Sequence, residues 1–118
     1  MLLAAASLIV FIGLVHSVLG ERYILIRLFR QPLPKILGDD SFTRQTLRFA
    51  WHLMTVTWYG LAFVLVLIHY ESASRTNLLY AVAVTVAITA LTALIASRGR
   101  HLSWIVFGAI AIICYLSV

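Results

Sequence analysis

The chain has 118 residues, of which 63% are hydrophobic and only 11% are charged, and its mean hydropathy is +1.02. Soluble domains are about 45–50% apolar and about 25% charged, and small ones bury only about two-thirds of the chain's surface. The composition therefore excludes an ordinary water-soluble globular protein and predicts an all-α integral membrane protein. The excess of nine Lys and Arg over four Asp and Glu does not indicate nucleic-acid binding, because these residues lie between the apolar runs.

Four apolar runs approach the roughly 20 residues that a helix needs to cross a bilayer. They are Leu2–Gly20, Phe49–Ile68, Leu78–Ala96 and Leu102–Val118. The sequence thus predicts a single membrane domain, residues 1–118, folded as a four-transmembrane-helix bundle. Basic residues follow the first run and none precedes it, which favours an anchored span over a secretory signal, where the positive charge comes first.

The connection after the first run, Glu21–Arg48, shows structure of its own. Its first part, residues 22–30, alternates basic and apolar residues, which suits either an interfacial helix or the end of the first span. Pro32 and Pro34 end this segment. The Asp-Asp-Ser sequence at residues 39–41 then predicts that the second helix begins near its serine, with the two acidic residues at the positive end of the helix.

The distribution of basic residues predicts an orientation. Eight of the nine Lys and Arg lie in the connections Glu21–Arg48 and Ser97–His101, whereas His69–Asn77 holds only Arg75. Basic connections are retained in the cytoplasm, so both termini are expected on the non-cytoplasmic side. We expect a bacterial inner membrane, with the basic connections facing anionic lipid headgroups.

Histidines are the main candidates for chemistry, because no Asp, Glu, Lys or Arg lies within the four runs. His16 lies five residues before Glu21 and His52 lies four residues after Arg48, so both are expected at a similar depth below the same interface. His101 lies closer to that interface. If these helices face one another, His16 and His52 could be the axial ligands of a b-type haem. With His101 and Glu21 they could instead hold a transition metal.

The alternative interpretation is that these residues fix helix contacts. His16 and His52 would then bond hydroxyls or carbonyls of a neighbouring helix, and Glu21 would form an interfacial ion pair with Arg48 or Arg100. Small and polar residues at helical spacing predict the packing faces. These are Gly13, Ser17 and Gly20 in the first helix, Arg48, Thr55 and Tyr59 in the second, and Trp104 and Gly108 in the fourth.

Two classes of function remain open from the sequence. The favoured class is a non-catalytic accessory, assembly or interaction component that associates with itself or with a larger membrane complex. The second is a metal- or haem-binding membrane protein that uses the histidines. No Gly-x-Ser-x-Gly elbow and no glycine-rich phosphate loop occurs, so the sequence does not indicate a reaction.

Overall fold

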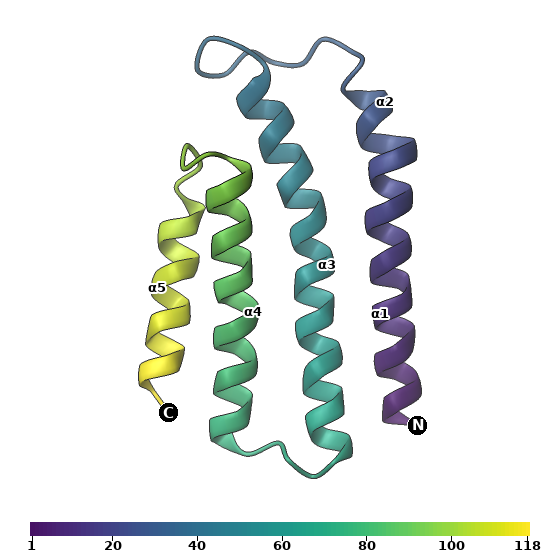
Figure 1. Cartoon of the computed structure of the whole chain (residues 1–118), viewed down its shortest axis with the longest axis vertical. Helices are drawn as coiled ribbons and strands as arrows, with labels where there is room; N and C mark the ends of the chain where they lie inside the picture. Colours follow the sequence, from purple (N-terminus) through teal and green to yellow (C-terminus); the bar gives the residue numbers. More distant parts are fainter.

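The computed structural model describes residues 1–118 and is all-helical, with 78% helix and no strands. Figure 1 shows the helices as rods with nearly parallel axes and alternating directions. Short connections join them, except for a longer one between α2 and α3. The elements are α1 (Leu2–Leu19), the π-helical turn η1 (Gly20–Leu25), α2 (Ile26–Leu28), α3 (Ser41–His69), α4 (Arg75–Ala96) and α5 (Ser103–Leu116).

Three continuous helical segments are long and apolar enough to cross a membrane: Leu2–Leu28, Ser41–His69 and Arg75–Ala96. The fourth apolar helix, α5, has 14 residues, which gives a length of about 21 Å at about 1.5 Å per residue. It is shorter than the expected run because Leu102 belongs to the turn before it and the helix ends before Ser117 and Val118. The all-helical class is confirmed, with three helices long and apolar enough to span a membrane and one shorter apolar helix.

The four rods lie side by side in a single layer. Contacts between the rods join α1 to α3, α3 to α4, and α4 to α5, and no rod contacts one beyond its neighbour (Figure 1). The molecule measures 50 × 32 × 14 Å, so its shortest dimension is close to the about 10–12 Å diameter of one helix. Only 14 of the 118 residues are buried. This helical bundle therefore has no interior in which all its helices meet.

The first span continues without a break into the basic segment that follows it. The π-helical turn η1 joins α1 to α2, and at its end the backbone N–H of Ile26 donates to the carbonyl of Glu21. The helix stops before the prolines, where the N–H of Phe29 still donates to the carbonyl of Leu25 at 2.9 Å. Of the two interpretations of residues 22–30, the end of the first span is confirmed.

The second long helix begins at Ser41, as expected. The carboxylate of Asp39 accepts hydrogen bonds from the backbone N–H of Ser41 at 2.9 Å and from its hydroxyl at 2.6 Å. Asp40 instead pairs with Arg44, one turn further along the helix. The chain enters this turn through Leu37 and Gly38, whose φ values are 61° and 100°, and the left-handed backbone suits glycine.

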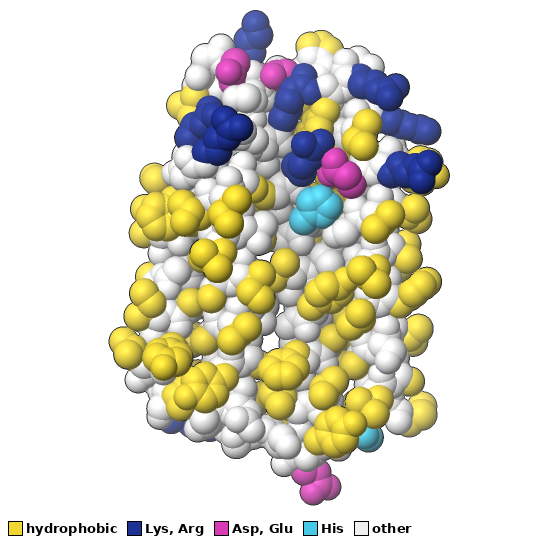
Figure 2. All heavy atoms as spheres, in the orientation of Figure 1, with side chains coloured by type: hydrophobic (Ala, Val, Ile, Leu, Met, Phe, Trp, Pro, Cys, Tyr) yellow, Lys and Arg dark blue, Asp and Glu magenta, His cyan; other side chains and the backbone are white.

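Both basic connections lie at the same end of the molecule, and the two chain termini lie at the other (Figure 1). Figure 2 shows that the Lys and Arg side chains gather at the first end, while hydrophobic side chains cover most of the visible surface below them. The fold thus separates a charged end from an apolar body.

Candidate functional site: a polar network between α1 and α3

The main polar cluster lies where the charged end meets the apolar body, between α1 and α3. The carboxylate of Glu21 lies 2.9 Å from Nη2 of Arg48 and accepts a hydrogen bond from its Nε at 3.2 Å. The same carboxylate lies 3.3 Å from Nε2 of His52. Figure 2 shows a histidine beside an acidic and a basic side chain at this level. Of the two ion pairs expected for Glu21, the one with Arg48 is the one formed.

The cluster continues from His52 into the apolar body. Nδ1 of His52 lies 3.0 Å from the hydroxyl of Ser17, and that hydroxyl lies 2.8 Å from the hydroxyl of Thr55. Thr55, which is buried, donates to the backbone carbonyl of Gly13 at 3.3 Å. We call the side chains of Ser17, Glu21, Arg48, His52 and Thr55 the α1–α3 polar network. It links the charged end to the backbone of α1 within the membrane span.

The donors and acceptors of the network determine where its hydrogens lie. The carbonyl of Gly13 only accepts hydrogen bonds, so the Thr55 hydroxyl donates its single hydrogen to it. In the bond between the Ser17 and Thr55 hydroxyls, Ser17 must therefore be the donor. Ser17 then has no hydrogen left for Nδ1 of His52, which must donate instead. Nε2 faces a carboxylate that also only accepts. All these bonds are therefore formed together only when both ring nitrogens of His52 carry hydrogen.

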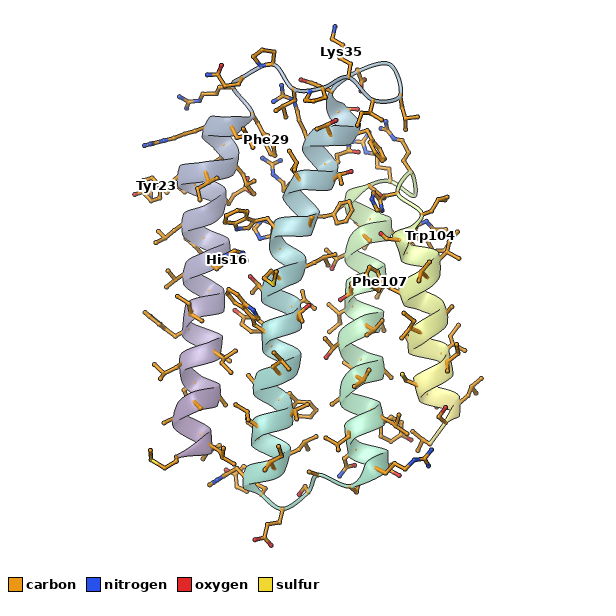
Figure 3. All side chains as sticks on the ribbon, turned by 180° about the vertical axis from the view of Figure 1, so that it is seen from behind. His16, Tyr23, Phe29, Lys35, Trp104 and Phe107 are labelled. Atoms are coloured by element: carbon orange, nitrogen blue, oxygen red, sulfur yellow. The ribbon has the colours of Figure 1, made fainter.

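His16 has a separate environment, made by the tryptophans of α3. Its Nε2 lies 3.2 Å from the carbonyl of Trp51, and the indole N–H of Trp51 donates to the carbonyl of His16 at 3.1 Å. The His16 ring stacks on Trp51 with centroids 4.5 Å apart and an interplanar angle of 1°, and lies 5.0 Å from the ring of Trp58. Figure 3 shows His16 on the side of α1 that faces α3.

The structure does not bring the three expected histidines together. His16 bonds to Trp51, whereas His52 bonds to Ser17 and Glu21. His16 and Ser17 are consecutive on α1, as Trp51 and His52 are on α3, and consecutive side chains of a helix lie about 100° apart around its axis. His101 lies near the start of α5, against Phe42 and Phe49, with ring centroids 6.0 and 5.1 Å away. No group of three or more His, Cys, Asp or Glu side chains is placed to hold a metal ion. Of the expected metal ligands, only Glu21 and His52 are in contact.

The small residues of α1 set its close approach to α3. A Cβ on Gly13 would lie 2.6 Å from Cε1 of Tyr59, and one on Gly20 would overlap the indole ring of Trp51. Trp51 was not among the residues predicted for this contact. It lies four residues before Thr55, on the same side of α3, so helical spacing from Thr55 was a usable signal for it.

The residues predicted in the fourth helix have local roles. The indole N–H of Trp104 donates to the carbonyl of Gly99 at 3.3 Å and so closes the turn between α4 and α5. A Cβ on Gly108 would meet nothing within 4 Å, so no other helix of the chain lies close to this glycine. His101 completes the same turn through its Nδ1, 2.8 Å from the hydroxyl of Ser103.

The α1–α3 polar network can fix two helices in register and can hold a proton between a carboxylate and an imidazole. The hydroxyls of Ser17 and Thr55 are both engaged within it. The cysteine, Cys114, lies near the C-terminal end of α5, away from the basic end. The chain matches no protein-family model, and neither a curated protein nor a solved structure shows significant similarity to it.

Proposed function

We propose that the protein is a non-catalytic interaction component of the membrane, an accessory or assembly subunit whose helical layer packs against further membrane helices. The observation that carries the proposal is the single layer, in which each rod contacts only its neighbours in the chain. Such a layer leaves both of its broad faces available. The helices that cover them come from further copies of the chain or from a larger membrane complex.

Polar groups in the middle of α3 support a protein partner rather than lipid alone. The hydroxyl of Tyr59 and the indole N–H of Trp58 form no hydrogen bond within the chain, although both residues lie near the centre of the Ser41–His69 span. An N–H or O–H left without a partner in hydrocarbon is costly, and helices in membranes often satisfy such groups across their contacts. A neighbouring helix with an acceptor at this depth would satisfy them.

The polar network has a structural role in this proposal. It joins α1 to α3 through charge-assisted and neutral hydrogen bonds, so that the layer presents a fixed surface. The structure offers no observation that favours a metal or a haem as a second function, because the imidazoles of His16 and His52 are each engaged with protein groups.

We place the protein in a bacterial inner membrane, with its basic connections in the cytoplasm and its termini in the periplasm. Two observations support this placement. Both basic connections lie at one end of the layer (Figure 1), and Arg75 is the single basic residue of the connection at the other end.

The proposal is tested by cross-linking each face of α3 in native membranes. In a Cys114→Ala background, Phe63→Cys and Leu61→Cys place a thiol on opposite sides of the helix, at positions that are 50% and 55% exposed. We expect a benzophenone maleimide attached to these thiols to link at least one of them, on irradiation, to a second copy or to a defined membrane protein, identified by mass spectrometry. Ala62→Cys, at a position 4% exposed, is the matched control and should remain unlinked. If both exposed thiols remain unlinked at the native expression level, the proposal is contradicted.

A further inference from the structure

A cavity of about 310 Å³ opens between α3 and α4 at the charged end of the layer. Five of its seven lining residues can form hydrogen bonds. The lining residues are Arg44, Gln45, Arg48, Phe49, His52, Thr92 and Ala96. The cavity lies beside the polar network, with which it shares Arg48 and His52.

A second cavity, of about 200 Å³, lies deeper between the same two helices and is mostly apolar. Its lining residues are Val56, Tyr59, Gly60, Phe63, Ala81, Val84, Thr85 and Ile88. His52 of the upper cavity and Tyr59 of the lower one are seven residues apart, which places them on the same face of α3. From His52 to Val56 the depth increases by about 6 Å at about 1.5 Å per residue. The two cavities therefore lie one above the other along the contact between α3 and α4, and we call this line of cavities the α3–α4 crevice.

The upper cavity offers donors suited to a phosphate group. Arg48 uses Nε and Nη2 for Glu21, and Arg44 uses its two terminal nitrogens for Asp40 and for carbonyls of the first connection. Nη1 of Arg48 and Nε of Arg44 have no partner within the chain. The N–H groups of a guanidinium match the geometry of phosphate oxygens.

Phospholipids carry a phosphate in the interfacial layer, both in zwitterionic headgroups such as phosphatidylethanolamine and in anionic ones such as phosphatidylglycerol. The charge of this end favours the anionic lipid. The two basic connections contain eight Lys and Arg and three Asp and Glu, a surplus of five positive charges.

We propose that the α3–α4 crevice is a binding site for an anionic phospholipid of the phosphatidylglycerol type. The phosphate binds at Arg44 and Arg48, and one acyl chain follows the lower cavity past Tyr59 and Gly60. The lipid comes from the leaflet at the charged end of the protein.

The experiment measures lipid binding to the full chain in mild detergent, by native mass spectrometry and by the unfolding midpoint. Palmitoyl-oleoyl phosphatidylglycerol should remain bound and raise the midpoint, whereas phosphatidylcholine of the same chains should do neither. Arg44→Gln with Arg48→Gln should weaken phosphatidylglycerol binding about tenfold or more. The control pair Arg22→Gln with Arg27→Gln removes the same charge outside the crevice and should retain binding.

A second variant separates loss of binding from loss of ion pairs. Thr92→Phe with Ala96→Phe adds two aromatic rings to the wall of the upper cavity from α4 and leaves the pairs of Arg44 with Asp40 and of Arg48 with Glu21 intact. It should lose phosphatidylglycerol while circular dichroism shows unchanged helicity. Equal binding of phosphatidylcholine, an equal loss in the control pair, or retained binding in the filled variant would overturn the proposal. Equal stabilisation by glycerol 3-phosphate or inorganic phosphate would also overturn it, since the ligand would then be a soluble anion.

Discussion

Gly20, the first residue of η1, lies so close to the indole ring of Trp51 that a Cβ at position 20 would overlap the ring. The same indole donates to the carbonyl of His16 and stacks on the His16 ring. One tryptophan thus fills the space that glycine leaves and satisfies two polar groups of α1. This contact and the polar network are what hold the first helix to the rest of the layer.

Gly20→Ala should therefore destabilise the protein, although alanine favours helix over glycine by about 1 kcal/mol. We expect a loss of about 1–3 kcal/mol in the free energy of unfolding, because the ring of Trp51 must move. Gly108→Ala is the matched control, since nothing lies within 4 Å of its new methyl group, and it should be neutral or stabilising. The measurement is unfolding by sodium dodecyl sulfate in mixed micelles, followed by circular dichroism. Equal effects of the two substitutions would contradict the close approach.

Ser17→Ala should weaken the contact between α1 and α3 by removing the hydroxyl that joins His52 to Thr55. Interhelical hydrogen bonds in membranes contribute about 0.6 kcal/mol on average and up to about 1.7 kcal/mol. Because two bonds are lost, we expect a decrease of about 1–2 kcal/mol in the same unfolding assay. Thr57→Ala is the control, as its hydroxyl bonds only the carbonyl of Leu53 in its own helix, at 3.0 Å. A decrease no larger than that of the control would show that the network contributes nothing to stability.

The first turn of α3 should lose stability in acid. The hydroxyl and backbone N–H of Ser41 hold the pKa of Asp39 below its usual value, and the hydrogen bond from Arg44 does the same for Asp40. A lowered pKa in the folded state gives a contribution that is complete above the unfolded pKa of about 3.9. This contribution is lost as the pH falls through the folded value.

Amide hydrogen exchange of residues 41–44, corrected for the intrinsic exchange rate, measures this loss between about pH 6 and pH 3. We expect protection to fall at the acidic end in the native chain. Asp39→Asn should show weaker protection at pH 6 and a smaller change with pH. Protection independent of pH in the native chain would contradict the role of these carboxylates.

The orientation is testable with single cysteines in a Cys114→Ala background. Gln31→Cys lies in the basic connection and Ser72→Cys in the connection between α3 and α4, and both positions are exposed. In intact bacterial cells, a membrane-impermeant maleimide should label Ser72→Cys directly and Gln31→Cys only after permeabilisation. Both thiols should react equally in detergent, which controls for reactivity. The reverse pattern would place the basic connections outside the cytoplasm.

The sequence was sufficient to predict the features that depend on composition and on local capping. The apolar runs predicted the helices, and the residues around Ser41 predicted where α3 begins. The interfacial position of Glu21 predicted an ion pair with Arg48 or Arg100, and the pair with Arg48 is the one formed. Each of these depends on spacing along the chain or on polarity at an interface, and both can be observed in a sequence.

The rotation of the helices could not be predicted in the same way. His16 and His52 lie at a similar level on α1 and α3, but level along the axis does not decide which side of a helix a residue occupies. Hydropathy does not indicate which side of α1 faces α3, because α1 is apolar around most of its circumference; the predicted stripe of Gly13, Ser17 and Gly20 does, since these residues contact α3. The close approach of Gly20 to Trp51 sets the rotation of α1. With this rotation the His16 ring stacks on the indole of Trp51, and the Ser17 hydroxyl contacts His52.

The single layer also has a consequence for how the chain assembles. Because each rod docks only on the one before it, no contact between the first and last helices has to form before the others become stable. Stability is then a sum over neighbouring pairs, as in repeat proteins, where each unit interacts with the next. A nascent chain can complete the α1–α3 contact while α5 is still being synthesised. Removal of α5 should leave the α1–α3 and α3–α4 pairs folded, because α5 packs on α4 alone.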